Sequence, residues 1–196
     1  AGYRATKHLI DQGCTRIAHF AGSKFINVYN LRLKGYLDAL EHNGLTVDED
    51  LIVSLKTLSL EEGMEATQKL LTFSQPPDGI FSANDTAAVG AILCAREKDV
   101  KVPEDLAIIG FNDDPVSSIV QPSLSTVSHP ARKMGELSTQ RILEHSAASL
   151  ESGISEITML DTEIIIRESS LRKGSKAQTT LGAKDSGKET ALQGSG

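Results

Sequence analysis

Apolar and polar residues in the first part of the chain follow helical and extended spacings in turn. Within residues 3–12 the apolar side chains fall on one face of a helix, and Gly13 follows as a typical stop signal. Residues 17–20 form a short, continuous apolar run, which predicts a buried strand. Residues 31–42 return to the helical spacing. The pattern predicts helix, strand and helix in that order.

The same alternation continues through the middle of the chain. Residues 51–55 predict a strand, and Ser59 with Glu62 has the spacing of a capping box at the start of a helix. The segments GIFSAN (79–84) and LAIIGF (106–111) are apolar runs that predict two further buried strands.

Strands that alternate with helices of 10 to 15 residues are typical of an α/β fold with a doubly wound parallel sheet. Between the last two strands, we expect Asp85 to cap a helix over residues 86–98. Ligands of such sheets bind at the carboxyl ends of the strands. This rule places the rim of a pocket just after Phe20, Leu55, Ser82 and Phe111.

Beyond residue 115 the alternation becomes less regular. Residues 122–127 are extended, 131–145 are helical, and 156–167 predict one or two strands. The helix has no strand of the same sheet around it, as expected for an element of a partner lobe that is absent from this chain. Residues 169–196 are rich in Ser, Gly, Lys, Thr and Ala, which predicts a flexible tail after a domain over 1–168.

Composition and charge narrow the classes of function. The 196 residues are 39% hydrophobic, and a net charge of -6 argues against a basic surface for DNA phosphates. The longest apolar stretches are far shorter than the roughly 20 residues of a membrane helix, so no membrane partner is expected. Cys14 and Cys94 lack any metal-ligand spacing, which fits a reducing cytoplasm.

Motifs of the common enzyme classes are missing from the sequence. It has no G-x-S-x-G elbow, no H-E-x-x-H, no Walker loop and no glycine-rich dinucleotide fingerprint. His8, His19, His42 and His145 are scattered, and isolated histidines are more often structural residues than metal ligands. We therefore expect no enzyme activity, no metal and no cofactor.

Four linked motifs carry a resemblance to a known family. They are RLKGYLDAL (32–40), PPDGIFSANDTAAVGAI (76–92), VPEDLAIIGFNDDP (102–115) and QPSLSTVSHPARKMGE (121–136). Together they resemble the lac-repressor and gal-repressor (LacI/GalR) family of transcription regulators, over about residues 1–168.

In that family, a small helix-turn-helix domain precedes a two-lobed sensor similar to periplasmic sugar-binding proteins. The resemblance therefore implies a truncated periplasmic-binding-protein-like domain, made mostly of the C-terminal lobe, without the DNA-binding domain. It implies a small-molecule effector, a sugar or sugar derivative, whose binding is coupled to operator DNA in a cytoplasmic full-length regulator.

Two ligand-binding positions implied by the resemblance are Arg32 and Asn84. Arg32 stands at the start of its helix, where its planar fork could hold two hydroxyls or a carboxylate. The alternative for Arg32 is a solvated helix residue. Asn84 ends its strand and could both donate to and accept from ligand hydroxyls, or else form a turn or cap the helix.

Three further positions depart from the family pattern. Asn112 stands where relatives usually have a carboxylate, so the ligand presents an acceptor there or Asp113 takes over. His129 replaces a frequent Gln and is either a ligand contact or a hinge residue. Leu58 stands where relatives often carry an aromatic residue, and an aliphatic side chain weakens a sugar-stacking role.

The resemblance also implies a homodimer. Its contact residues are expected to be Met64, Val89, Ile92, Ile119 and Val120, with ordinary core packing as the alternative. The competing function is a periplasmic sugar-binding protein of a transport system. An enzyme on the same scaffold is the remaining alternative, because a fold does not determine a function.

Overall fold

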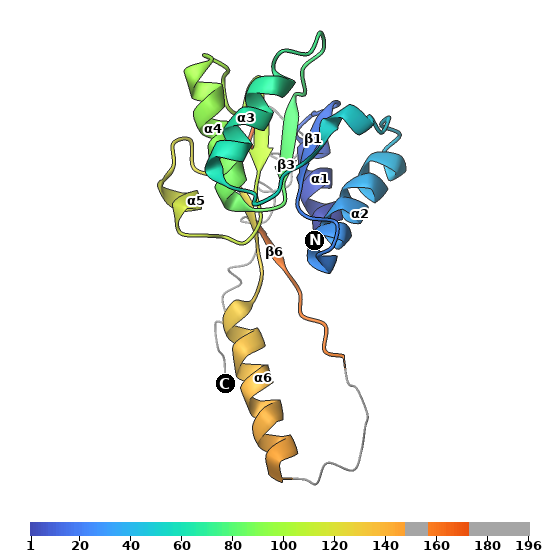
Figure 1. The fold of residues 1–196 in the computed structure, drawn as a ribbon, viewed down its shortest axis with the longest axis vertical. Coiled ribbons are helices and arrows are strands. Elements are labelled where there is room, and N and C mark those ends of the chain that lie inside the picture. The colour runs from blue at the N-terminus through green and yellow to red at the C-terminus, as the bar shows by residue number, and fades with distance from the viewer. Residues whose placement is uncertain (148–156, 173–196) are drawn as a thin grey trace, which may run out of the picture.

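The computed structural model describes residues 1–147 and 157–172. In these residues, one sheet holds four parallel strands in the order β2-β1-β3-β4. The strands are β1 (Ile17–Ala21), β2 (Ile52–Ser54), β3 (Gly79–Ser82) and β4 (Ala107–Ile109). All four run in the same direction, so their carboxyl ends meet at one edge of the sheet (Figure 1).

Helices cover both faces of this sheet (Figure 1). One face carries α1 (Gly2–Asp11) and α2 (Asn27–His42), and the other carries α3 (Leu60–Leu70) and α4 (Asp85–Glu97). The doubly wound α/β fold predicted from the sequence is thereby confirmed. Each predicted strand and helix is present, although α2 begins four residues earlier than the apolar spacing indicates.

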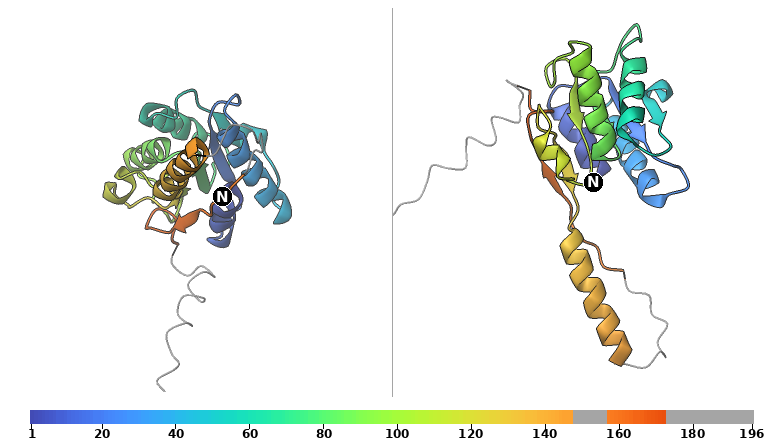
Figure 2. Two further views of the ribbon diagram at one scale, coloured as in Figure 1. Left: turned by 90° about the horizontal axis from the view of Figure 1, so that it is seen from below. Right: turned by 60° about the vertical axis from the view of Figure 1, so that its left-hand side comes forward.

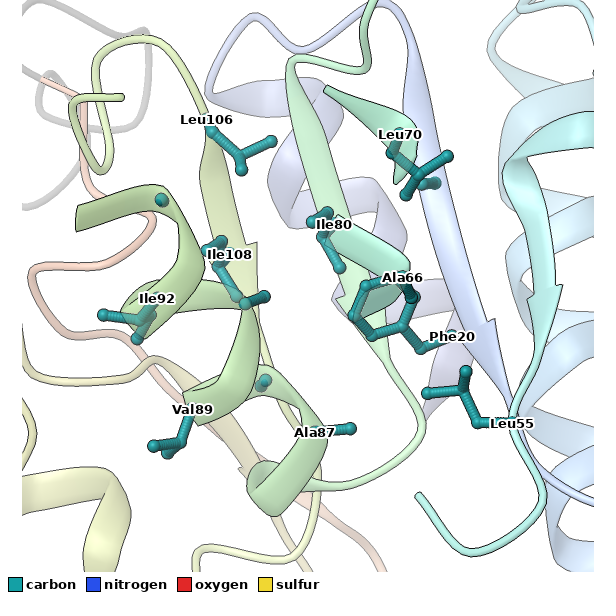
Figure 3. Close-up of a cluster of buried hydrophobic side chains, with 14 of the residues drawn as sticks. Phe20, Leu55, Ala66, Leu70, Ile80, Ala87, Val89, Ile92, Leu106 and Ile108 are labelled. Atoms are coloured by element: carbon teal, nitrogen blue, oxygen red, sulfur yellow. The ribbon is translucent and has the colours of Figure 1, made fainter. Parts of the chain in front are cut away.

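Two apolar cores follow from the alternation of side chains along the strands. Ala18, Phe20, Ile80 and Ile108 point to the side of α3 and α4, where they meet Ala66, Leu70, Ala87 and Ile92 (Figure 3). Their strand neighbours pack on the other side against Ala5, Leu9, Tyr36 and Leu40 of α1 and α2. Because both faces of β1, β3 and β4 are buried, these strands are mostly apolar in sequence, with the buried His19 and Ser82 as exceptions.

The chain beyond β4 first stays beside the sheet and then leaves it. After the short helix α5 (Val116–Ile119), β5 (Thr126–Ser128) forms parallel bridges to the β4 side and pairs antiparallel with β6 (Glu163–Ile165). Between them, α6 (Ala131–Ala147) extends away from the sheet, and most of its described side chains are exposed (Figures 1 and 2). This placement matches the expectation that α6 has no strand of this sheet around it.

The fold includes four residues that the sequence analysis assigned to the tail. Ser169 and Ser170 are fully buried, and Ser169 exchanges backbone hydrogen bonds with Ile108 and Ser123. Arg172 donates to the carbonyls of Pro103 and Asp78. The domain boundary at residue 168 was therefore wrong, because backbone pairing holds a polar segment that has little apolar surface. The rest of the predicted tail, 173–196, lies outside the described residues.

Candidate functional site

The connections of the sheet define a crevice between the carboxyl ends of β1 and β3. These strands are neighbours, but the helix after β1 (α2) and the helix after β3 (α4) lie on opposite faces. The segments that follow β1 and β3 therefore diverge to opposite faces at this edge, which makes it the topological switch point of the sheet. A doubly wound sheet usually has its ligand crevice at this point. All of the ligand-binding positions expected from the sequence come from segments that begin or end near this edge.

Arg32 reaches this crevice from the second turn of α2. Its guanidinium donates from Nη1 to the carbonyl of Ala83 after β3, and from Nη2 to Oδ1 of Asn112 after β4 at 3.5 Å. The guanidinium carbon lies 3.7 Å from the ring centroid of Phe111 and 5.6 Å from that of Tyr29. Hydrogen bonds and ring stacking thus hold the planar fork at the switch point, rather than leaving it solvated.

Asn84 is the N-cap of α4, a role that the sequence analysis gave to Asp85. Its Oδ1 accepts from the backbone N–H of Ala87 at 3.0 Å, and its Nδ2 donates to the carbonyl of Leu58 at 3.0 Å. Asn84 therefore caps the helix, as one of its alternatives proposed, and the prediction that Asp85 is the N-cap was wrong. Since Asn84 remains half-buried at the edge, its cap does not remove it from the crevice.

Asp85 instead connects the crevice to the later strands. It is fully buried, and its carboxylate accepts from the hydroxyl of Thr126 and from the N–H of Asp114, each at 2.7 Å. Burial raises the pKa of this carboxyl, although both hydrogen bonds oppose the shift. A Cβ on Gly110 would lie 2.1 Å from Oδ1 of Asp85, so only glycine fits there. This network could not be predicted from the sequence, in which only the position of Asp85 after a strand pointed to it.

Asn112 follows β4 in a backbone conformation with φ 120°, and Asp113 follows it at φ 61°. These positive angles turn the chain away from the strand direction and bring the amide of Asn112 to Arg32. Asp113 is engaged elsewhere, because its carboxylate pairs with Arg167 at 2.8 Å. The alternative in which Asp113 replaces Asn112 at the ligand is therefore disfavoured.

His129 lies between β5 and α6, where the chain leaves the sheet. It is half-buried, and its Nδ1 is buried without a hydrogen-bond partner among the described residues. Leu58 is only 2% exposed and belongs to the core on the α3 and α4 side. Its side chain is therefore not available to a ligand in this conformation, which corrects its expected contact, and only its carbonyl reaches Asn84.

The residues expected at a dimer contact fall into two groups. Val89 and Ile92 are 4% and 0% exposed and belong to the core, so for these two the alternative of core packing holds and the expected contact was wrong. Met64 and Val120 are half-buried. Ile119 is 74% exposed at the end of α5, which leaves it free for a contact with another chain.

A hollow of about 470 Å³ opens beside the crevice, at the ends of β1 and β2. It is lined by Gly22, Ser23, Lys24, Ser54, Leu55 and Lys56. Gly22 packs against the ring of Tyr29, whose centroid lies 5.6 Å from the guanidinium carbon of Arg32, so the hollow and Arg32 share Tyr29 as a neighbour. The sequence predicted this rim from the strand ends, but not the two lysines.

Chemistry other than ligand binding has little support in the described part of the chain. No group of three or more His, Cys, Asp or Glu side chains there could hold a metal ion. Both cysteines are buried and unpaired, and burial raises the pKa of the Cys14 thiol to about 12, which keeps it protonated. No helix in the described ranges is long and apolar enough to cross a membrane.

Comparisons with known proteins agree with this geometry. The model of the periplasmic binding protein-like domain family matches residues 6–170. The HTH-type transcriptional regulator DegA of Bacillus subtilis is 41% identical over 134 residues, which take in 68% of this chain and 39% of DegA.

Two solved structures show the same fold. A LacI-family transcriptional regulator from Sanguibacter keddieii superposes with a TM-score of 0.78 at 31% identity, over 86% of this chain and 63% of that one. The complex of the transcriptional regulator CelR with cellobiose superposes with a TM-score of 0.74 at 31% identity, over 86% of this chain and 50% of that one. This chain thus spans less than two thirds of each of these relatives. It belongs to the periplasmic binding protein-like domain family, in the form found in LacI-family transcriptional regulators.

Proposed function

We propose that this chain is the sensing domain of a transcription regulator, which binds a small-molecule effector, a sugar or sugar derivative, in the crevice at the carboxyl edge of its sheet. The observation that carries this proposal is the position of Arg32. Its guanidinium is fixed at the switch point by Phe111, Ala83 and Asn112, with further N–H groups left to donate to a ligand. The solved relative with bound cellobiose supports a sugar-like effector.

Arg32, Asn84, Asn112 and His129 would contact the effector from one side. The exposed helix α6 and its apolar side chains Met134, Ile142 and Leu143 would pack in a second lobe that supplies the opposite wall. Binding would then favour one orientation of the two lobes, since a ligand shifts such an equilibrium only by its different affinity for the two states.

The regulatory output would be a change in operator binding. The DNA contact would come from a helix-turn-helix domain outside these 196 residues, because this chain is acidic, with a net charge of -6. The regulator would act as a homodimer, with Ile119, Met64 and Val120 at or near the contact. The exposed Ile119 supports this assembly.

Replacement of Arg32 by Ala tests the proposal. We expect Arg32→Ala in the full-length regulator to weaken effector binding by at least about tenfold, the loss of one charge-assisted hydrogen bond of roughly 1.5 to 3 kcal/mol, and to leave operator affinity without effector nearly unchanged. Mono- and disaccharides, including cellobiose, are first screened by thermal shift and then titrated by calorimetry. Equal affinities of wild type and variant for a sugar that binds would remove Arg32 from the site.

A further inference from the structure

We infer that the effector carries an acidic group, a carboxylate or a phosphate, which Arg32 holds in the crevice. This inference rests on the proposed function, because it specifies the chemistry of the ligand at that same site. It comes from the charges that the fold leaves without a counter-charge at the carboxyl edge.

Arg32 is a half-buried cation whose protein partners are all neutral. Ala83 offers a carbonyl oxygen, Asn112 offers an amide oxygen, and Phe111 and Tyr29 offer ring faces. In the described residues, no carboxylate lies within ion-pair distance of its guanidinium. The site therefore fixes the direction of the fork without neutralising its charge.

A charge held in this way is costly unless something neutralises it, because burial takes it out of water. The pKa of Arg32 is lowered from its usual value mainly by this loss of solvent, and the nearby Tyr29 and Asp85 only partly offset the effect. A guanidinium nevertheless stays protonated near neutral pH. An anionic ligand would supply the missing counter-charge and accept two parallel N–H groups from the fork.

Two of the three carboxylates close to the crevice already have other partners. The fully buried Asp85 accepts from Thr126 and from the backbone of Asp114. Asp113 pairs with Arg167. Asp114 is half-buried, and its backbone N–H donates to the carboxylate of Asp85. None of these acids takes the place of a counter-charge on Arg32.

The adjoining hollow adds two further cations. Lys24 and Lys56 line it at the ends of β1 and β2, both are exposed, and neither forms an ion pair within the described ranges. The nearest acid on α3, Glu62, is held by the backbone N–H groups of Lys56 and Thr57. An acidic group bound at Arg32 would thus lie beside a positive rim, which favours its approach.

The experiment compares sugars with and without an acidic group. Glucuronate, its neutral counterpart glucuronamide, and glucose 6-phosphate are titrated at constant ionic strength into the ¹⁵N-labelled full-length regulator. The NMR signals of the Arg32 Nε–H and the Asn112 side-chain amide report binding at the crevice. We expect saturable shifts with one or both acidic probes, at a Kd at least tenfold lower than for glucuronamide. The stronger of the two acids identifies the acidic group as carboxylate or phosphate.

Three variants separate this inference from general electrostatic attraction. Arg32→Gln should abolish the preference for the acidic probes, whereas Lys34→Gln should keep it, because Lys34 lies in the same helix but pairs with Asp38 at 2.7 Å. Asn112→Asp would place a carboxylate beside Arg32, and it should weaken binding of the acid at least tenfold more than binding of glucuronamide. The amide spectrum of each variant establishes that it is folded.

The outcomes distinguish this inference from the proposed function. Equal affinity for glucuronate, glucose 6-phosphate and glucuronamide at the crevice would overturn the acidic group and leave a sugar-binding site in place. Saturable shifts that survive in Arg32→Gln would also overturn it. The lack of any shift at the crevice with all three probes would contradict both the inference and the proposed sugar site.

Discussion

Phe111 is the residue on which the orientation of Arg32 depends most directly. Its ring is 4% exposed, belongs to the core on the α1 and α2 side, and lies 3.7 Å from the guanidinium carbon. A ring fixed in the core offers a flat surface that limits the rotamers of the arginine above it. Phe111 therefore acts as a positioning residue rather than as a ligand contact.

Phe111→Leu tests this positioning role. We expect effector binding to weaken by about tenfold, since a desolvated cation–π contact contributes up to about 2 kcal/mol, along with a modest loss of stability. Phe20→Leu is the matched control, because Phe20 is equally buried but packs on the other face of the sheet. Calorimetry and urea unfolding measure both effects, and an equal loss of affinity in both variants would contradict the specific role of Phe111.

His19 is a buried ionisable residue in the centre of β1. It is 0% exposed, stacks between Tyr36 and Phe81, and pairs through Nδ1 with the carbonyl of Phe81 at 2.8 Å. Burial lowers its pKa from 6.5 to about 4, and the charge of Arg32 adds to the shift. The folded chain therefore keeps this ring neutral under conditions in which the unfolded chain binds a proton.

This difference predicts a loss of stability in mild acid. Between pH 6.5 and about 4, the unfolded state holds more protons at His19 than the folded state, so the free energy of unfolding falls as the pH falls. The full effect is at most about 3 kcal/mol. His8, whose pKa burial also lowers, contributes in the same direction.

His19→Phe isolates the contribution of His19. The variant keeps a stacked ring but cannot titrate, so its urea midpoint should decrease less than that of the wild type between pH 7 and pH 4.5. Parallel profiles for the two proteins would show that His19 is not the group responsible.

Among the elements, α3 and α4 pack at unusually short range. A Cβ on Gly63 would lie 2.2 Å from the carbonyl oxygen of Ala87, and one on Gly90 would lie 2.1 Å from that of Leu60. Because the neighbouring atoms belong to helix backbones, they cannot move aside as a flexible side chain could. The two glycines therefore set the distance between α3 and α4, the helix that Asn84 caps.

Gly90→Ala should destabilise the chain by about 1 to 3 kcal/mol, although alanine favours helix more than glycine does. Gly135→Ala in α6 is the control, since nothing lies within 4 Å of the added methyl group. There we expect no loss, or a gain of up to about 1 kcal/mol. Urea unfolding of both variants makes the comparison, and a stabilised Gly90→Ala would contradict the close packing.

The elements themselves could be predicted well from the sequence, because buried parallel strands and amphipathic helices leave plain periodicities. The capping box of Ser59 and Glu62 is present as predicted. The predicted cap of α4 was wrong by one residue, because Asn and Asp are both good N-caps. Only the structure shows that Asn84 accepts from the N–H of Ala87, while the carboxylate of Asp85 accepts from the hydroxyl of Thr126.

Contacts between segments distant in sequence could not be predicted in the same way. The strand-end rule placed the rim of the crevice, and the family resemblance placed Arg32 and Asn112 on it. The stacking of Arg32 on Phe111 and the burial of Val89 and Ile92 depend on how helices pack in three dimensions. Such packing leaves no periodic pattern in a single sequence. Ser169 and Ser170 were assigned to the tail because their segment has little apolar surface, and pairing of its backbone with distant residues leaves no periodic pattern in the sequence.

At the scale of the whole molecule, the last described segment joins the two ends of the fold. Ser170 lies 2.7 Å from Nε2 of His8 on α1 and from Oγ of Ser125 before β5. Ser169 pairs with Ile108 on β4, and the backbone N–H of Arg172 donates to Oε1 of Gln12. This short polar segment thus closes the side of the sheet next to β4.

A chain that ends at Glu168 should therefore be much less stable than one that ends at Arg172. Removal of residues 169–172 leaves three buried groups without partners: the ring of His8, the N–H of Ile108 and the N–H of Ser125. Each group that stays buried costs about 1 to 3 kcal/mol of stability. The urea midpoints of the two chains measure the difference. Similar midpoints would show that the segment adds nothing to the fold.

The contact between His8 and Ser170 also bears on the order of events during synthesis. The two residues are separated by 162 positions, so the ribosome makes α1 long before it makes the partner that completes its burial. Such distant contacts slow folding, and partly folded chains expose apolar surface in the meantime. The burial of α1 must therefore wait for almost the last described residues, and a translational pause before Ser170 would prolong the time for which this helix stays incompletely buried.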